Sequence, residues 1–360
     1  MPCVDQFDET MNQPYDALLL VSFGGPEGMD DVMPFLENVL RGKNVPAERM
    51  RAVAHHYELF EGVSPINEQN RRLIAALKDE LAANGPRLPI YWGNRNWHPL
   101  LADTLREMAA DGIKRALAFF TSAYSSYSGC RQYREDIERA RAEVGPAAPQ
   151  VEKLRAFYNH PGFIEANIDN VRAALAQIPE QRRAAAEIAF TAHSIPLSMA
   201  VGCAYQSQLL ETCHLIAAEL EHERWRLVFQ SRSGPPGQPW LEPDICDYLS
   251  ELKEAGAQDV VIAPVGFISN HMEVLYDLDT EARALCERLG LKMARAATVG
   301  AHPVFVRMIR ELILERVEPA TPRRFLGERG TVADACPADC CLMGAARPAP
   351  TMNAATPNDG

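Results

Sequence analysis

The sequence lacks any stretch that is long and apolar enough to cross a membrane. Its longest mostly apolar stretches, residues 17–23 and 260–268, fall far short of the ~20 residues that a bilayer-spanning helix needs. No lysine or arginine precedes Arg41, whereas secretory and transit peptides carry basic residues close to the N-terminus. We therefore predict a cytoplasmic protein without a transmembrane segment.

Several common catalytic and nucleotide-binding motifs are also missing. The chain contains no H-E-x-x-H zinc-protease motif, no G-x-S-x-G nucleophile elbow and no P-loop lysine motif. The glycine-rich segment SFGGPEG (residues 22–28) lacks the third glycine of a dinucleotide-binding loop. It predicts instead a turn in which the backbone approaches a flat ligand closely.

The chain has fewer basic than acidic residues. The chain has 36 Lys and Arg against 48 Asp and Glu, a formal net charge of −12. This balance argues against a nucleic-acid partner and favours a cationic ligand. With 360 residues, 47% hydrophobic and 23% charged, the chain is large enough for two domains with their own cores. The sequence shows no conspicuous apolar stripe of the kind that would form a dimer surface, so we expect a monomer.

Short apolar runs alternate with longer segments of helical period, which predicts an α/β fold with doubly wound, mainly parallel sheets. The predicted strands are residues 16–23, 88–93, 115–121, 151–157, 187–193, 224–230, 258–264 and 291–297. The predicted helices are residues 67–83, 99–110, 133–143, 162–177, 205–222, 243–253, 272–289 and 303–317.

The strands divide into two similar halves, and the segment VGPAAPQ (residues 144–150) separates them with one glycine and two prolines. We predict an N-terminal half at residues 14–146 and a C-terminal half at residues 147–318. Residues 319–360 contain six prolines, and we expect this tail to lack regular structure except around its cysteines.

His193 stands at the carboxyl end of a predicted buried strand, in the segment FTAHSIP (residues 190–196). Ligand sites of open α/β sheets lie at the carboxyl ends of the strands. A histidine there is suited to accept a proton near neutral pH or to bind a metal. The alternative interpretation is a hydrogen-bonded structural histidine.

An acidic row follows in the segment VGFISNHMEVLYDLDTE (residues 265–281). Glu273, Asp277 and Glu281 stand at i, i+4 and i+8, so on a helix they share one face over about 12 Å. His271 precedes this row. Such carboxylates can pass a divalent cation from solvent to an interior site. The alternative is a solvated acidic face.

The nine cysteines of a cytoplasmic chain do not predict disulfides. Cys336, Cys340 and Cys341 lie close together in the tail, and Cys3, Cys130, Cys203, Cys213, Cys246 and Cys286 are scattered. An iron–sulfur cluster or a structural zinc generally needs four ligands. We predict Cys130, in the loop-to-helix segment 122–133, as the fourth ligand. Adjacent cysteines favour a [2Fe–2S] cluster over zinc, and free thiols are the third alternative.

Five segments together resemble the ferrochelatase family: FTAHSIP, GFISNHMEVLYDLD, VSFGGPEG, EGVSPIN and LVFQSRSGPP. The resemblance runs from about Tyr15 to Val317 and is greatest to the actinobacterial branch, whose members are coproporphyrin III ferrochelatases. It implies two Rossmann-like domains around a porphyrin cleft. It also implies an enzyme that inserts Fe²⁺ into coproporphyrin III in haem biosynthesis.

The resemblance assigns roles to the residues of the acidic row and its partner histidine. His193 and Glu273 match the two residues implicated in binding iron and in removing the pyrrole protons, and His271 matches a neighbouring histidine. Asp277 and Glu281 match outer acidic residues of an iron entry path, on a helix with π character in the family.

Other positions match residues that contact the porphyrin. They are Ser64, Tyr133, Arg41, Tyr57, Arg95 and Phe23. Paired hydrogen bonds from arginine suit the carboxylates of coproporphyrin, so the resemblance implies a basic pocket inside an acidic protein. Two positions depart from the family. Asn270 replaces an aspartate of many relatives, and Phe23 replaces a tyrosine that ligates the product iron in some relatives, a contact that phenylalanine cannot make.

The resemblance also bears on the cysteines. Some family members hold a [2Fe–2S] cluster with C-terminal cysteines and one cysteine from the first half, as Cys130, Cys336, Cys340 and Cys341 would.

Three alternatives to this function stay open. They are a protoporphyrin IX ferrochelatase, a cobalt or nickel chelatase of another tetrapyrrole, and a non-enzymatic haem or iron–sulfur sensor. The lack of a long hydrophobic insertion favours coproporphyrin over protoporphyrin. For the mechanism, we predict that binding energy distorts the macrocycle. We also predict that His193 and Glu273 face opposite sides of the ring, one delivering iron and the other accepting protons.

Overall fold

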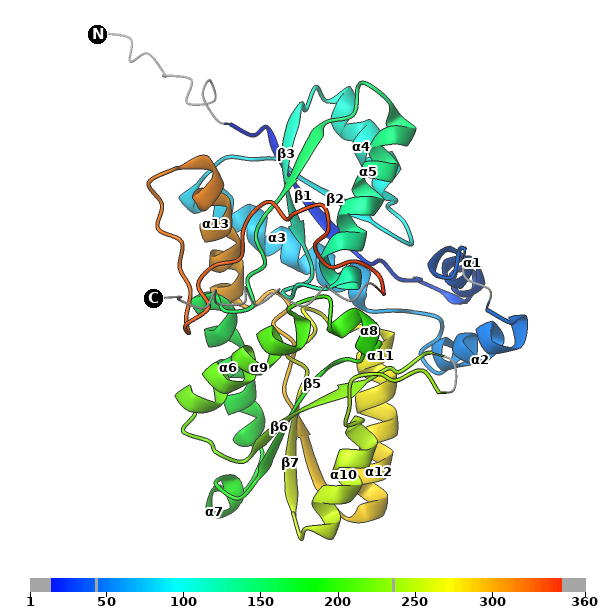
Figure 1. Cartoon of the computed structure of the whole chain (residues 1–360), viewed down its shortest axis with the longest axis vertical. Helices are drawn as coiled ribbons and strands as arrows, with labels where there is room; N and C mark the ends of the chain where they lie inside the picture. The colour runs from blue at the N-terminus through cyan, green and yellow to red at the C-terminus, as the bar shows by residue number, and fades with distance from the viewer. Residues whose placement is uncertain (1–13, 43–44, 235–236, 345–360) are drawn as a thin grey trace, which may run out of the picture.

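The computed structural model describes residues 14–42, 45–234 and 237–344. Eight strands form two parallel sheets of four (Figure 1). The first sheet has the order β2-β1-β3-β4 and contains β1 (Ala17–Ser22), β2 (Ile90–Asn94), β3 (Arg115–Phe120) and β4 (Gln150–Lys153). The second has the order β6-β5-β7-β8 and contains β5 (Glu187–His193), β6 (Trp225–Gln230), β7 (Asp259–Ala263) and β8 (Lys292–Arg295). Because each half repeats the same order, the predicted doubly wound fold is confirmed.

The predicted helices are also confirmed. They are α3 (Ile66–Asn84), α4 (Leu101–Ala110), α5 (Gln132–Val144), α6 (Pro161–Leu175), α9 (Tyr205–Glu219), α10 (Ile245–Glu254) and α13 (Pro303–Val317). The predicted helix at residues 272–289 consists of α11 (Met272–Val274), a π-helical segment η3 (Leu275–Ala282) and α12 (Arg283–Leu289). Outside the predicted helical ranges lie α1 (Met29–Val39), α2 (Ala47–Glu58), η2 (Tyr127–Arg131), α7 (Glu180–Arg183) and α8 (Leu197–Ala200).

Both faces of each sheet are covered, and one hydrophobic core joins the two halves. All six residues of β1 are buried, as a strand between two helical layers requires. The shared core contains Phe119 from β3, Phe190 from β5 and Phe305 from α13. Helices α4 and α5 cover the outer face of the first sheet (Figure 1). The halves therefore pack as one body around this core.

The boundary between the halves differs from the predicted one. β4 pairs with β3 in parallel register, with Gln150 opposite Arg115, so the chain completes its first sheet after the Pro-rich segment at residues 144–150. The proline-containing segment ends α5 but does not end the domain. We therefore place the boundary after Lys153 rather than at residue 146.

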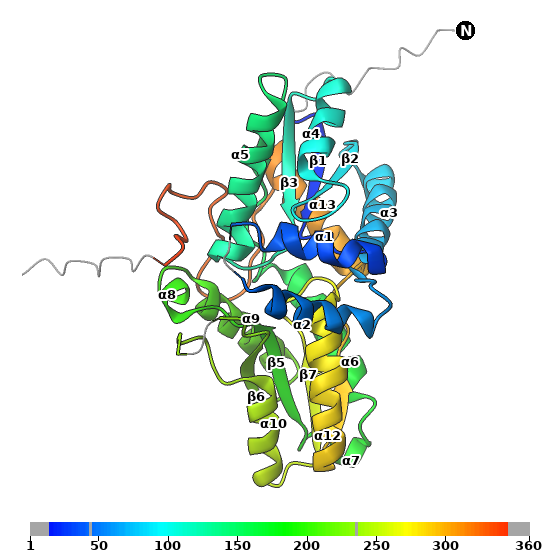
Figure 2. The ribbon, with the colours of Figure 1, turned by 90° about the vertical axis from the view of Figure 1, so that its right-hand side faces the viewer.

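Helices α1 and α2 form a separate pair beside the junction of the halves (Figure 2). Val32, Phe35 and Tyr57 of this pair are buried in a small cluster that also includes Met272 of α11. The helix pair thus belongs to the first half in sequence but packs against the second.

The described part of the tail, residues 318–344, contains no helix or strand, and this includes the segment of Cys336, Cys340 and Cys341, where regular structure was expected. It crosses from α13 to the lower end of α5 (Figure 1), held by side chains that donate to its carbonyl groups. Cys3 and residues 345–360 lie outside the described residues. Among the described residues, no helix has the length and hydropathy to span a membrane.

Candidate active site

The candidate site lies at the carboxyl end of the second sheet. His193 is the last residue of β5, whose preceding six residues are all buried. Gly266, in the turn after β7, packs on this strand so closely that a Cβ atom there would lie 2.6 Å from Ala192 Cα. Glycine is therefore required for the turn to reach the strand end.

Glu273 reaches the same point from α11. The helix begins at His271, whose Nδ1 accepts the backbone N–H of Glu273 at 3.2 Å. Glu273 Oε1 then lies 3.4 Å from His193 Nε2. The other nitrogen of His193, Nδ1, contacts the carbonyl of Ser194, and Tyr205 OH donates to the His193 carbonyl at 3.0 Å. These contacts hold the imidazole with Nε2 toward the carboxylate.

Each member of this pair changes the pKa of the other. Burial lowers the pKa of His193, but the charge and hydrogen bond of Glu273, together with the Ser194 carbonyl and Asp277, raise it to about 9. Burial raises the pKa of Glu273, but the charge and hydrogen bond of His193, together with His271, lower it to about 2. At neutral pH the free protein therefore holds an imidazolium–carboxylate pair.

The acidic row continues from Glu273 along η3, and its predicted π character is confirmed. Asp277 accepts a hydrogen bond from the Ser231 hydroxyl and one from Gln230 Nε2 at 3.3 Å. Burial raises the pKa of Asp277 to about 7 despite the Ser231 hydrogen bond, and Glu273 and Glu281 add to the increase. Asp277 is thus poised to exchange a proton near neutral pH.

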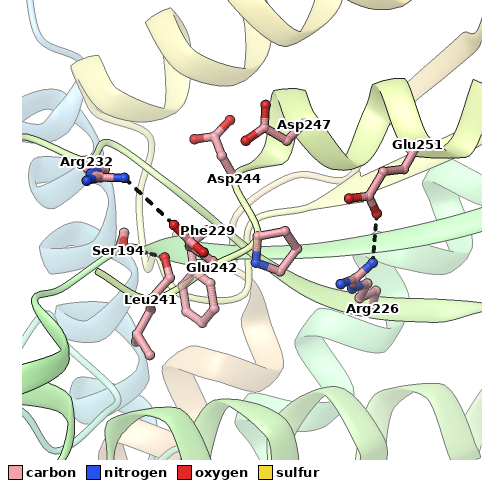
Figure 3. Close-up of a pocket in the computed structure, with 10 residues that line it drawn as sticks. Ser194, Arg226, Phe229, Arg232, Leu241, Glu242, Asp244, Asp247 and Glu251 are labelled. Atoms are coloured by element: carbon pink, nitrogen blue, oxygen red, sulfur yellow. Dashed lines mark hydrogen bonds and ion pairs between the residues drawn. The ribbon is translucent and has the colours of Figure 1, made fainter. Parts of the chain in front are cut away.

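A pocket of about 390 Å³ lies between β6 and α10 (Figure 3). Asp244 and Asp247 line it at the start of α10, and Arg226 pairs with Glu251 at 3.0 Å. Burial and the nearby Asp244 raise the pKa of Glu281, so the acidic surface extends from η3 to this pocket. The pocket is not lined by His193 or Glu273.

The helix pair α1–α2 forms the opposite wall of the site. His56 of α2 stacks on Tyr276 of η3, with ring centroids 3.7 Å apart and planes 7° apart. Burial raises the pKa of Tyr57, and the Glu273 carboxylate raises it further, which places these two groups near each other. Phe23, after β1, is partly exposed and contacts Phe35 edge to face at 6.2 Å.

The predicted porphyrin-contacting residues do not all have free side chains. Ser64 is buried beside Gly25, where a Cβ atom would lie 2.8 Å from its hydroxyl. Arg41 is exposed. Arg95 is buried, paired with Asp136, and its guanidinium lies 4.4 Å from the ring centre of Tyr133.

Arg95 is therefore already paired in the free protein, and its role as a ligand of a porphyrin carboxylate stays a prediction. Asp136 is itself buried and also pairs with Arg139 at 2.6 Å. Asp136 would therefore keep one cationic partner, Arg139, if Arg95 turned toward a ligand.

The predicted arrangement of His193 and Glu273 on opposite sides of the ring is wrong for this structure. A flat macrocycle between two groups needs about 7 Å, two van der Waals contacts, whereas the two side chains are 3.4 Å apart. Both must therefore approach a macrocycle from the same side.

The cysteines of the tail lie beside Cys130. The thiol of Cys130 is within hydrogen-bonding reach of Cys336, and the Cys340 and Cys341 sulfurs are 3.4 Å apart. Hydrogen bonding to Cys130 lowers the pKa of Cys336 to about 5, against burial, and Lys153 and Arg134 lower it further. Arg131 of η2 donates to the carbonyls of Ala338 at 2.7 Å and Cys340 at 3.0 Å.

Cys203 is a neighbour that the sequence did not single out. Its charge raises the pKa of Cys341, although it comes from the second half of the chain. No spacing signal links residue 203 to the tail, so only the folded chain brings them together. Across residues 14–42, 45–234 and 237–344, no group of three or more His, Cys, Asp or Glu is set to hold a metal ion as it stands.

A family model named Ferrochelatase matches residues 15–317. The chain belongs to the ferrochelatase family. A "Ferrochelatase" of Rhodopirellula baltica is 61% identical over 336 residues, which cover 93% of this chain and 95% of that protein. A "Coproporphyrin III ferrochelatase" of Streptomyces coelicolor is 53% identical over 359 residues, with 93% and 96% covered.

A solved structure supports the fold of this ferrochelatase family member. "SirB from Bacillus subtilis with Fe3+" has a TM-score of 0.50 at 12% identity and covers 85% of this chain and 97% of that one. At this identity the likeness concerns the two-sheet fold alone. The resemblance to the actinobacterial branch is supported separately by relatives in Streptomyces and Frankia that share the coproporphyrin name.

Proposed function

We propose that this protein inserts Fe²⁺ into coproporphyrin III to form Fe-coproporphyrin III in haem biosynthesis. The observation that carries the proposal is the contact of His193 with Glu273 at the inner end of a carboxylate row on a π helix. Imidazole nitrogen is a suitable ligand for iron, and carboxylate oxygens suit divalent cations. The names of the relatives support coproporphyrin III as the substrate.

In this proposal the macrocycle lies between the His193–Glu273 pair and the first-half wall. Phe23 and Tyr133 contact the macrocycle, and the exposed Arg41 is available to its periphery. Ser64, Tyr57 and Tyr133 are buried in the free protein, so they reach the ring only when the wall adjusts around it. Phe23 itself offers no oxygen to the iron. Arg95 acts by holding Tyr133 in place through their 4.4 Å contact.

Iron enters along the acidic row. Glu281 and Asp277 pass Fe²⁺ inward, and at the inner end it displaces the proton that His193 carries, because a metal and a proton compete for the same imidazole nitrogen. The displaced proton leaves to solvent. His193 Nε2 and a Glu273 oxygen then hold the ion on one side of the ring. Transfer to the macrocycle frees both groups again.

Metallation releases two pyrrole protons. Once His193 has lost the iron it regains its basicity and accepts one proton, and the Glu273 charge stabilises the imidazolium that forms. Asp277, with a pKa of about 7, takes the second proton outward along the row. Distortion of the bound ring, supplied by contacts at its periphery, exposes the nitrogen lone pairs.

The test is anaerobic incubation with Fe²⁺ and coproporphyrin III or protoporphyrin IX in parallel, followed by the visible absorption of the porphyrin. Rapid metallation of coproporphyrin III alone is expected. His193→Ala and Glu273→Gln should abolish insertion but retain porphyrin binding, measured by fluorescence quenching. His214→Ala and Glu254→Gln, at exposed positions of α9 and α10, are the matched controls. Normal turnover of the site variants at saturating substrate would contradict the proposal.

We also propose that Cys130, Cys336, Cys340 and Cys341 hold a [2Fe–2S] cluster. The support is the convergence of these four thiols from two distant segments, with Cys130 and Cys341 buried. Four thiolates are the usual ligand set of such a cluster, and the residues fit it in number and kind. When bound, the cluster supplies one-electron redox chemistry; the cysteines themselves fix the tail to η2.

The cluster proposal is tested by iron and acid-labile sulfide analysis after anaerobic reconstitution of the full chain. Cys340→Ala should lose both, whereas Cys246→Ala, at a cysteine of α10 outside the group, should retain them. Zinc bound in place of iron, or no metal at all, would refute the cluster.

A further inference from the structure

A buried lysine lies beside the tail cysteines without a carboxylate partner. Lys153, at the end of β4, is 8% exposed. Within the part of the chain that the structure describes, its ammonium makes one hydrogen bond, to the carbonyl of Ala333 at 3.4 Å, and no ion pair with Asp or Glu. A buried ammonium is costly unless an anion accompanies it. The anion must therefore come from another kind of group.

Two thiols lie within reach of the Lys153 charge. A small cavity is lined by both Lys153 and Cys130, and the charge of Lys153 reaches Cys130 and Cys336. A second cation, Arg134, also acts on Cys336, and its Nε atom is buried without a hydrogen-bond partner among the described residues. Two cations thus converge on the cysteine group, in an otherwise acidic protein.

We propose that Lys153 is the charge-compensating residue of the cysteine site and sets the reduction potential of the cluster bound there. This inference rests on the proposed [2Fe–2S] cluster. A cluster held by four thiolates carries a net negative charge that increases on reduction. A buried cation stabilises the reduced form more than the oxidised form and so raises the potential. Arg134 contributes in the same direction, but less, because it is partly exposed.

The alternative is that Lys153 only anchors the tail through the Ala333 carbonyl. Lys153→Gln separates the two roles, because the glutamine amide can still donate to a carbonyl but carries no charge. Lys153→Arg keeps the charge. Lys114→Gln removes a charge from an exposed lysine in the same half and serves as the matched control.

The experiment is a dye-mediated redox titration of the reconstituted full chain, followed by visible absorption and electron paramagnetic resonance. Lys153→Gln should shift the midpoint potential to lower values, and Lys153→Arg and Lys114→Gln should leave it close to that of the unaltered protein. A cluster with an unshifted potential in Lys153→Gln overturns the assignment.

A second variant covers the case in which Lys153→Gln does not fold. Arg134→Gln should also lower the potential, by a smaller amount, and an unshifted potential in that variant then overturns the assignment. Failure of the unaltered protein to bind iron and sulfide refutes the cluster itself. The two failures are therefore distinguishable.

Discussion

The contact between His193 and Glu273 makes a prediction about a single histidine. Glu273 accounts for two of the causes that raise the His193 pKa to about 9, its charge and its hydrogen bond. Glu273→Gln removes the charge, so burial, which lowers the pKa, is opposed only by the Ser194 carbonyl and Asp277. We expect the pKa of His193 to fall well below 9, because burial, the largest cause that remains, lowers it. At pH 7.5 the protonated fraction of His193, roughly 97% in the unaltered protein, then decreases.

The measurement is an NMR titration of the histidine ring carbons in protein labelled at histidine. The chain has nine histidines, and the spectrum of His193→Ala identifies the resonance that belongs to His193. Glu254→Gln is the control for loss of a carboxylate elsewhere. A His193 pKa that stays near 9 in Glu273→Gln would refute the electrostatic argument.

The same pair makes stability depend on pH in a defined direction. The raised pKa of His193 stabilises the folded state fully below pH 6.5, and this contribution is lost as the pH rises through 9. The lowered pKa of Glu273 stabilises it above pH 4.5, and this contribution is lost as the pH falls through 2. Urea unfolding of the unaltered protein and Glu273→Gln should differ most between pH 4.5 and 6.5.

Three further outcomes are expected. Asp277→Asn removes a carboxyl group with a pKa of about 7. It should raise the KM for Fe²⁺ by roughly 10-fold to 100-fold and abolish the rise in kcat/KM through pH 7. An unchanged pH profile of kcat/KM would contradict the proposed iron path. Glu315→Gln breaks a buried ion pair with Arg155 at 2.7 Å and should lower the free energy of unfolding, measured in urea, by about 3–5 kcal/mol. A loss below about 1 kcal/mol would contradict the importance of this pair for stability. His56→Ala removes the stack on Tyr276 and should raise the porphyrin KM about 2-fold to 10-fold at constant kcat, measured by steady-state kinetics.

The strands were predictable from sequence because parallel sheets buried on both faces require continuous apolar runs. The six residues ALLLVS of β1 are all buried, and their sequence has no alternation of polar and apolar residues that would predict a half-exposed strand. The end of the first sheet was not predictable in the same way. Proline and glycine at residues 144–150 mark where a helix ends, but the pairing of β4 with β3 depends on residues far apart in the chain.

The site residues were predictable in kind but not in arrangement. His193 and Glu273 are recognisable because a histidine at a strand end and a carboxylate row on a helix are chemically unusual. Their 3.4 Å contact depends on a turn at Gly266 and a helix start at His271, and local sequence does not encode how these meet. The pairing of Arg95 was not predictable for a related reason, because it depends on Asp136 lying beside it in the fold.

The chemistry of this site is divided between the halves of the chain. The groups proposed to handle iron and protons, His193, Glu273 and Asp277, all come from the second half, whereas Tyr133 and Tyr57 come from the first. The two sets meet where α2 packs on η3 through His56 and Tyr276. Substitutions in the first-half wall should therefore act mainly on the porphyrin KM, and those in the acidic row on the iron steps.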